Sequence, residues 1–326
     1  MTGMIDRRTA IGLDIGGSSA KVALVSAAGE VLAHVVVPTA DSRDPDDILE
    51  PFASAVDRLR ALAVERGFAV AALGCGVPGN LDPARERILY NNVPALDGLA
   101  LAAWLRARHG LPVALDNDSI VAALGEVSRL DPAEARRRVL SVTIGSGIGV
   151  VLLVGGEVVR LVEGVTGDAG HIIVDAGSAT RCPVGCRGCL ETVASGTALA
   201  RAGRIAAESG ASRLLARALG ERGKVTGADV SAAAETGDDA ARGILREAGR
   251  WLGIGLASMS PLYAPDLIIL GGGVARAGID WLDAAERALR EHGMPHYSTR
   301  VRLRRAALGE RAGVIGAALL ALAAAE

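Results

Sequence analysis

Three of the four cysteines of this chain lie within eight residues, a short distance after a histidine. The histidine is His171, and the cysteines are Cys182, Cys186 and Cys189. One imidazole and three thiolates form the ligand set of a closed, structural zinc site, and the intervening glycines let the backbone wrap an ion. Cys186 and Cys189 also form a Cys-x-x-Cys pair, which is typical of a redox dithiol or an iron–sulfur site as well. Zinc is the interpretation that uses all four residues.

A second group of polar residues lies at the expected junction of a strand and a helix. It reads Asp116-Asn117-Asp118 and precedes an apolar run. Such residues are commonly helix N-caps, which bind backbone N–H groups. A carboxylate at this junction can instead accept a proton from an alcohol while glycine loops hold a phosphate donor. The segment is therefore a candidate for the general base of a phosphoryl transfer.

Three glycine-rich segments each follow an expected strand. Two of them, Asp14–Lys21 and Thr143–Gly149, combine glycines with hydroxyl side chains, which are the components of an anion-binding nest. Taken singly, each also fits a tight hairpin turn, and neither has the Gly-Lys-Ser/Thr ending of a Walker loop. The third, Gly271–Gly273, lies between a strand and a helix, where the backbone can approach a nucleotide closely. Three such loops in one chain favour nucleotide binding.

The elements that would position these residues alternate between strands and helices. Apolar runs and amphipathic periodicity predict strands at 10–13, 21–26, 31–37, 70–77, 112–115 and 266–270, and helices at 45–66, 99–109 and 119–127. The segment 138–162 repeats the opening pattern of paired strands around a glycine turn. Its uncharged stretch is divided by glycines, unlike a membrane span. The repeat predicts a duplicated α/β architecture with ligands in the cleft between the halves.

Composition limits the classes of partner. The chain has 326 residues, 50% of them hydrophobic, which is enough for two compact lobes. Its 35 basic and 37 acidic residues give a net charge of -2, which argues against nucleic-acid and membrane surfaces. Aromatic residues make up only 2%, so base-stacking platforms are not expected. With no visible signal peptide and no disulfide framework, a reducing, cytoplasmic compartment is expected.

Several of these motifs follow one another as they do in the ROK family of repressors, open reading frames and sugar kinases, which the chain resembles. They are Asp14-Ile-Gly-Gly17, Gly76-Val-Pro-Gly79, Asn117-Asp118, Gly145-Ser-Gly147, Gly167-Asp-Ala-Gly-His171, the cysteine segment through Glu191, and Gly271-Gly-Gly273. The resemblance implies a two-lobed, actin-like ATPase (ribonuclease H-like) fold, and usually a homodimer. The first α/β lobe would span 1–116 and be completed by a C-terminal helix at 312–326. The second, with the zinc loop, would span 117–311.

The resemblance also implies roles for matching residues. Asp118 matches the catalytic base, and the sugar contacts match Gly79, Asn117, Asp118, Asp168, His171 and Glu191. ATP would be bound by Asp14, Gly16, Gly17, Ser18, Lys21, Thr143, Gly145, Gly147, Gly271 and Gly272. Mg²⁺ would accompany ATP and offset the charge of the transferring phosphoryl group. His171 would bind zinc through one ring nitrogen and face the sugar with the other.

Three positions depart from the family's pattern. Val184 stands where the family has a middle cysteine, and Cys186 follows two residues later. Asp168 replaces a glutamate and is shorter by one methylene, or roughly 1.5 Å of reach. Ile120 stands where asparagine is common, which removes a polar group near the site. These differences bear on the shape of the zinc loop and on the choice of sugar.

The function implied is that of an ATP-dependent kinase of a hexose or hexose-like sugar, glucokinase-like and acting on the 6-hydroxyl. N-acetylmannosamine, fructose and allose are alternative substrates, and polyphosphate is an alternative donor. ROK repressors place a winged helix-turn-helix before the first glycine loop, and only 13 residues precede Asp14 here, so a DNA-binding regulator is not expected. A zinc-stabilised sugar-binding protein without catalysis is the other class, and the presence of Asp118 argues against it.

Overall fold

The computed structural model describes residues 8–39, 41–90, 93–161 and 168–325, so Gly167 of the predicted sugar motif lies outside the described residues. The chain divides into two compact units. The first comprises the described residues up to 135 together with 158–161 and 310–325, and the second comprises 136–157 and 168–309. The lobe boundary at residue 116 stays a prediction. The predicted first lobe ends at residue 116, whereas the first compact unit continues to residue 135. The added residues include the helix Asp118–Val127, which packs on the C-terminal helix.

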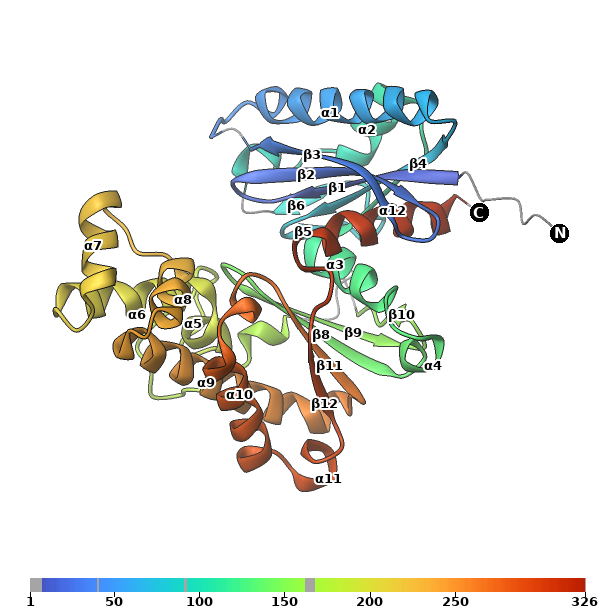
Figure 1. The fold of residues 1–326 in the computed structure, drawn as a ribbon. Helices are drawn as coiled ribbons and strands as arrows, with labels where there is room; N and C mark the ends of the chain where they lie inside the picture. Colours follow the sequence, from blue (N-terminus) through green and yellow to red (C-terminus); the bar gives the residue numbers. More distant parts are fainter. Residues whose placement is uncertain (1–7, 40, 91–92, 162–167, 326) are drawn as a thin grey trace. The chain divides into compact units, whose positions relative to one another are not determined.

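The first unit is built on a five-stranded mixed sheet (Figure 1). In spatial order its strands are β3 (Val31–Pro38), β2 (Ser19–Ser26), β1 (Arg8–Ile15), β4 (Ala69–Val77) and β7 (Val113–Asn117). The first three form an antiparallel meander, whereas β4 runs parallel to β1 and β7 runs parallel to β4. The predicted strands of this region are therefore confirmed.

Helices cover both faces of this sheet (Figure 1). One face carries α1 (Pro45–Glu65) and α2 (Leu101–His109), and the other carries α3 (Asp118–Val127) and α12 (Ala312–Ala324). The remaining elements are short: β5 (Asn80–Leu81), β6 (Ile88–Tyr90), η1 (Pro94–Leu96), α4 (Pro132–Ala135) and η5 (Gly309–Arg311). The three predicted helices are confirmed to within about two residues at their ends.

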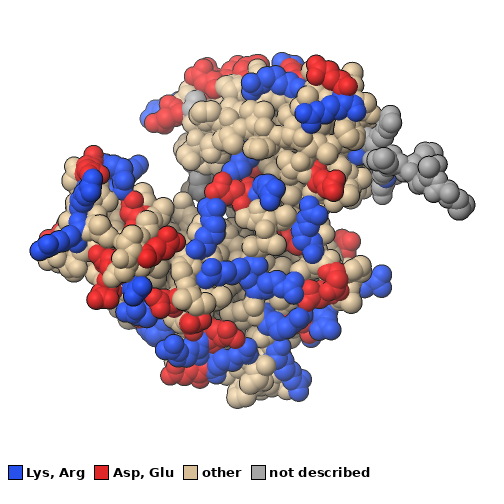
Figure 2. Space-filling model, in the orientation of Figure 1, with Lys and Arg blue, Asp and Glu red and all other residues tan. Residues whose placement is uncertain are grey.

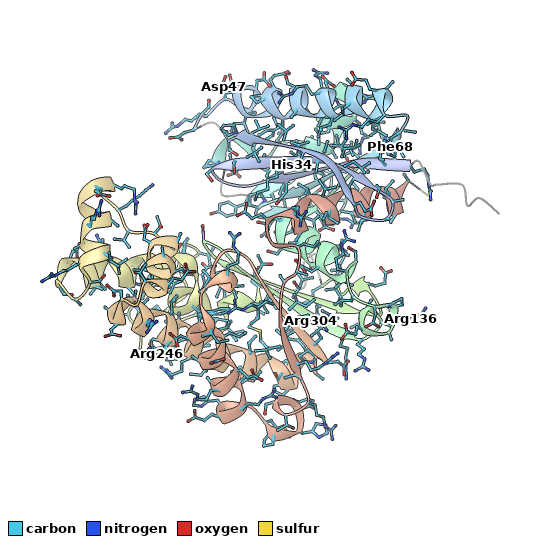
Figure 3. All side chains as sticks on the ribbon, in the orientation of Figure 1. His34, Asp47, Phe68, Arg136, Arg246 and Arg304 are labelled. Carbon is cyan, nitrogen blue, oxygen red and sulfur yellow. The ribbon has the colours of Figure 1, made fainter. Side chains whose placement is uncertain are left out.

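The sequence explains why α1 begins where it does. Asp44 caps the helix by accepting a hydrogen bond from the backbone N–H of Asp46 at 3.0 Å. Pro45 follows the cap, and its fixed φ suits the first turn of a helix. Asp46 and Asp47, the latter labelled in Figure 3, add two more carboxylates beside the positive end of the helix dipole.

Glycines bring α12 unusually close to the sheet. A Cβ atom at Gly12 of β1 would overlap the carbonyl oxygen of Val314, and one at Gly74 of β4 would overlap the carbonyl oxygen of Ala317. Gly316 of α12 approaches the backbone of Val121 in α3 in the same way. Backbone atoms therefore form much of the contact between α12 and its neighbours. Larger residues at these glycine positions would push α12 away from the sheet and from α3.

The second unit repeats the same sheet plan. Its strands, in spatial order, are β10 (Glu157–Val158), β9 (Ile148–Val154), β8 (Arg138–Ile144), β11 (Leu267–Gly271) and β12 (Arg302–Arg305). β9 is antiparallel to β8, β11 runs parallel to β8, and β12 runs parallel to β11. The duplicated α/β architecture predicted from the two glycine hairpins is confirmed.

Most of the second unit outside the sheet is helical (Figure 1). Its helices are η3 (Ala169–His171), α5 (Leu190–Ala194), α6 (Gly196–Glu208), α7 (Arg213–Arg222), α8 (Gly227–Glu235), α9 (Asp239–Tyr263), η4 (Val274–Arg276), α10 (Ile279–His292) and α11 (Pro295–Ser298). Among the residues that the structure describes, no helix combines the length and the apolar character needed to span a bilayer. Figure 2 shows basic and acidic side chains interspersed on the visible face.

Candidate active site

Asp118, the predicted base, lies at the first position of α3, directly after β7. Its Oδ1 accepts hydrogen bonds from the backbone N–H of Ser119 at 2.7 Å and from the Ser119 hydroxyl at 3.3 Å. Burial raises the pKa of the Asp118 carboxyl to about 6, although both groups of Ser119 act to lower it. A carboxyl with this pKa is ionised at neutral pH and remains a competent proton acceptor.

The neighbouring Asp116 has a different environment. Its side chain is buried, and Arg160 donates hydrogen bonds to both of its carboxylate oxygens, with 3.2 Å between Nη1 and Oδ1. Arg85 adds a third contact at 3.4 Å, and the backbone N–H of Asn117 donates to Oδ1 at 2.9 Å. Charge-assisted hydrogen bonds of this kind hold a carboxylate in one orientation. Asp116 is therefore a structural anchor, and Asp118 is the better candidate for proton transfer.

Asn117 is held from two sides. Its Oδ1 accepts a hydrogen bond from the backbone N–H of Ser119 at 2.9 Å, so it is the N-cap of α3. Its Nδ2 donates to the carbonyl oxygen of Gly79 at 2.9 Å. Gly79 has a φ of 102°, a left-handed value that favours glycine. The structure thus brings together Gly79, Asn117 and Asp118, three of the predicted sugar contacts.

The first glycine loop joins β1 to β2. Its tip is a tight hairpin turn closed by a hydrogen bond from the Gly16 N–H to the Ser19 carbonyl oxygen at 3.0 Å, and Gly17 and Ser18 are exposed. Asp14 precedes the turn. Burial, followed by the charge of Asp118, raises the pKa of Asp14 to about 6, while Lys21 lowers it. The charge of Asp118 therefore acts on the carboxyl group of Asp14 within the first unit.

The second glycine loop joins β8 to β9 and is tied to α6. The Gly196 N–H donates to the Gly145 carbonyl oxygen at 2.7 Å, and the Thr197 hydroxyl donates to the Ser146 carbonyl oxygen at 2.8 Å. A pocket of about 600 Å³ opens beside this loop. The first turns of α6 and α8 line it, and helix N-termini favour phosphate groups. The pocket's position beside these helix starts suits the phosphate groups of a nucleotide.

The pocket contains residues that the sequence did not indicate. Gly145 lines it, whereas Thr143, Gly147, Gly271 and Gly272 do not. Its other lining residues are Ser146, Gly196, Thr197, Ala200, Val225, Thr226, Gly227, Ala228, Ser231, Ala232, Glu235, Gly273, Val274, Arg276 and Ala277. The capping box of Thr226 and Asp229 is a recognisable helix start, but such a signal carries no information about what the helix lies beside.

His171 and the three clustered cysteines come together in the second unit. Their ligand atoms all lie within 4.8 Å of one another, and His171 Nδ1 is 3.7 Å from the sulfur atoms of both Cys182 and Cys189. These separations suit a tetrahedral ion with zinc–sulfur bonds of about 2.3 Å. Cys186 belongs to the group, while Val184 is exposed, so the shifted cysteine still reaches the cluster.

The loop around the cluster depends on two glycines. Gly185 has a φ of 102° and Gly188 a φ of 61°. A Cβ atom at Gly188 would also overlap the carbonyl oxygen of Asp175. These glycines allow the chain to fold back so that the N–H of Cys182 donates to the carbonyl oxygen of Cys186 at 2.9 Å.

The other predicted sugar contacts flank the cluster. Asp168 is exposed at the start of η3, where its carbonyl oxygen accepts a hydrogen bond from the N–H of His171 at 2.8 Å. Glu191 lies in the first turn of α5, directly after Cys189 and Leu190. Its Oε2 accepts a hydrogen bond from the N–H of Ile148 at 3.0 Å. Asp168, His171 and Glu191 are therefore parts of one local framework within the second unit.

Comparison with known proteins gives consistent matches over nearly the whole chain. A model of the ROK family matches residues 10–324. A glucokinase of Streptomyces coelicolor is 33% identical over 318 residues, which cover 95% of this chain and 96% of that protein.

Solved structures give the same result for the fold. The crystal structure of a ROK family glucokinase from Streptomyces griseus in complex with glucose and AMPPNP is 32% identical, with a TM-score of 0.81 and coverage of 97% of this chain and 99% of that one. A ROK family transcriptional regulator, described as a homolog of the Escherichia coli MLC protein, is 26% identical with a TM-score of 0.82, and the match covers 96% of this chain and 77% of the regulator. The predicted actin-like fold is confirmed.

Proposed function

The chain belongs to the ROK family, and we propose from this premise that it is an ATP-dependent hexose kinase of the glucokinase type. The observation that carries the proposal is Asp118, a half-buried carboxyl group with a raised pKa that is oriented by Ser119, at the position that matches the family's base. Full-length similarity to glucokinases supports the same conclusion.

In the proposed reaction, Asp118 accepts the proton of the sugar 6-hydroxyl as that oxygen bonds to the γ-phosphorus of ATP. The bond between the γ-phosphorus and its bridging oxygen breaks, and ADP leaves with that electron pair. Asn117 fixes the start of α3 and thereby the carboxylate, and Asp168, His171 and Glu191 orient the sugar hydroxyl groups. Nucleotide binding is assigned to the two glycine hairpins, the segment Gly271–Gly273 and the pocket beside α6 and α8.

Two ions belong to the proposal. Zinc would be held by His171, Cys182, Cys186 and Cys189, whose spacing fits a tetrahedral site. With Nδ1 turned to the sulfur atoms, the other ring nitrogen of His171 is left for a substrate hydroxyl. Asp14 offers a hard oxygen ligand suited to Mg²⁺, which neutralises charge on the phosphates when it is bound with ATP.

A coupled assay for ADP release tests the proposed function. Purified protein is supplied with ATP and glucose, mannose, N-acetylmannosamine, fructose or allose, and polyphosphate replaces ATP in a parallel series. We expect sugar-dependent ADP release that is fastest with glucose. Sugar binding without phosphorylation of any member of the panel would instead favour a non-catalytic sugar-binding protein.

The pH dependence of turnover is the first specific prediction. Because the base must be ionised, kcat/KM, which reports the free enzyme, should rise with pH through about 6, the raised pKa of Asp118. The hydrogen bond from the Ser119 hydroxyl lowers this pKa, so its loss in Ser119→Ala should move the rise to higher pH. The measurement compares the pH profiles of the wild type and of this variant. An unchanged profile in the variant would assign the titration to another group, such as Asp14.

Asp168 carries a prediction about sugar choice. If the protein is an ordinary glucokinase, Asp168→Glu should raise kcat/KM for glucose, because a contact misplaced by about 1 Å can cost on the order of 10²-fold. If its true substrate is another sugar, the longer side chain should leave glucose poor and weaken that substrate. Kinetics of both forms across the sugar panel distinguish these results, and identical profiles would exclude Asp168 as a specificity determinant.

The homodimer implied by the family resemblance and the cytoplasmic location expected from the cysteine usage are also proposals. Size-exclusion chromatography with light scattering tests the first, and cell fractionation tests the second. A monomer at micromolar concentration would contradict the expected dimer.

A further inference from the structure

Glu191 connects two parts of the second unit that have different proposed ligands. Its position matches a sugar contact, yet its Oε2 accepts the N–H of Ile148 at 3.0 Å. Ile148 is the first residue of β9 and directly follows the second glycine loop. One oxygen of a proposed sugar ligand therefore already holds the loop assigned to the nucleotide.

The loop is shaped around this carboxylate. A Cβ atom at Gly147 would overlap Glu191 Oε2, whereas one at Gly145 would have no atom within 4 Å. Neither glycine has a left-handed φ, so the space that a side chain at Gly147 would need is limited by Glu191 and not by backbone strain. A side chain at Gly147 would therefore displace the Glu191 carboxylate.

The first turn of α5 and the first residue of α6 hold the loop at its two ends. Glu191 of α5 is bonded to Ile148 after the loop, and Gly196 of α6 donates to the carbonyl oxygen of Gly145 at 2.7 Å. Gly145 and Gly196 both line the pocket, whereas Glu191 does not. A movement of α5 would therefore be transmitted directly to the pocket wall.

The segment that carries His171 and the clustered cysteines holds the N-terminal end of α5. Cys189 is its N-cap, and the N–H of Leu190 donates to the carbonyl oxygen of Ile172, the residue after His171. Gly170 packs so closely on β9 that a Cβ atom there would overlap the carbonyl oxygen of Ile148. The segments that carry the proposed sugar contacts His171 and Glu191 are therefore in direct contact with the start of β9, which follows the second glycine loop.

We infer that Glu191 is a positioning residue for the second glycine loop and that it couples sugar binding to nucleotide binding. This inference rests on the proposed function. A sugar hydroxyl bound to Oε1 would restrain the carboxylate whose Oε2 holds Ile148. A restrained carboxylate holds the loop in place for the nucleotide, so sugar should raise the affinity for nucleotide. Nucleotide then raises the affinity for sugar by the same factor, because coupling between two binding sites is reciprocal.

The first test perturbs the loop and measures sugar binding in the absence of nucleotide. Gly147→Ala should displace the Glu191 carboxylate and weaken binding of the best sugar substrate by about tenfold, within the usual range of coupling between sites. Gly145→Ala adds the same methyl group to the same loop without meeting Glu191, and it should weaken sugar binding much less. Isothermal titration calorimetry gives both dissociation constants, and thermal melting checks that each variant is folded.

The second test perturbs Glu191 and measures binding of AMPPNP in the absence of sugar. A residue that only contacted sugar would leave this affinity unchanged, whereas a positioning role predicts about tenfold weaker binding in Glu191→Ala. Glu191→Gln keeps a carbonyl oxygen for the Ile148 N–H and should recover most of the nucleotide affinity while sugar binding stays weak. These measurements of AMPPNP binding to the Glu191 variants test the inference even if Gly147→Ala does not fold.

The outcomes separate the inference from the function on which it rests. Wild-type protein should bind sugar about tenfold more tightly when AMPPNP is present, and Gly147→Ala and Glu191→Ala should lose this effect. Active wild-type enzyme with unaltered sugar affinity in Gly147→Ala and unaltered AMPPNP affinity in Glu191→Ala would overturn the inference alone. A wild-type protein that phosphorylates no sugar would overturn the proposed function.

Discussion

Replacing Asp118 with asparagine is expected to lower kcat by about 10²–10⁴-fold, because the change removes a general base and keeps the shape of the side chain. The amide oxygen of asparagine can still accept the N–H of Ser119, so α3 should begin at the same residue. Sugar binding, measured by calorimetry, should be retained. Near-wild-type turnover in this variant would assign catalysis to a different residue.

Stability provides the control for this variant. Burial raises the pKa of Asp118 from 3.8 to about 6, so the folded protein binds this proton more tightly than the unfolded chain. Stability therefore falls as pH rises from about 4 to 6, and the penalty is complete above that range. The asparagine side chain carries no charge, so Asp118→Asn should melt at a higher temperature than wild type at pH 8 and at a similar one at pH 4. If the variant were inactive because it misfolds, its melting temperature would be below that of the wild type at both pH 4 and pH 8.

Replacing Cys189 with serine is expected to remove the bound metal and weaken sugar binding by about 10–100-fold, the range seen when groups that orient a site's ligands are altered. Cys189 is fully buried and is both a cluster member and the N-cap of α5. Metal analysis of tag-free protein should give about one zinc per chain in the wild type and little in the variant. The melting temperature should fall as well, since a structural ion stabilises only the folded state.

Cys75→Ala is the matched control. Cys75 is equally buried, but it lies in β4 of the first unit and outside the cluster. This variant should keep its zinc even if removal of the thiol costs some stability. A wild-type protein that contains no zinc, and whose activity survives chelation, would remove the metal from the proposal.

Local patterns account for the parts of the fold that the sequence predicts well. The hairpins at Gly16 and Gly145 combine glycines with flanking apolar runs, so their strands follow from short-range signals. Ile120 stands out in the sequence only as a missing polar group, but it is buried in α3, where its apolar side chain contributes to the core. Spacing along the chain also predicts Cys186 as a member of the proposed cluster, and its sulfur atom lies there.

Contacts between distant residues account for what the sequence did not predict. Asp116 is paired with Arg85 and Arg160, which lie 31 and 44 residues away, and nothing local distinguishes these arginines from others. The pocket residues around Thr226 belong to a helix whose start is recognisable, but whose neighbour in space is set by the packing of α6 and α8. Such choices are made by tertiary structure, which a single sequence does not reveal.

The close packing of α12 on β1 and β4 affects the order in which the two units can fold during synthesis. The strands that contain Gly12 and Gly74 leave the ribosome before the second unit, whereas α12, which packs on them, leaves after it. The part of this sheet face that α12 covers therefore stays exposed while the second unit is being translated, and exposed apolar surfaces invite aggregation. The second unit, whose described segments are separated only by residues 158–167, can finish folding before the first.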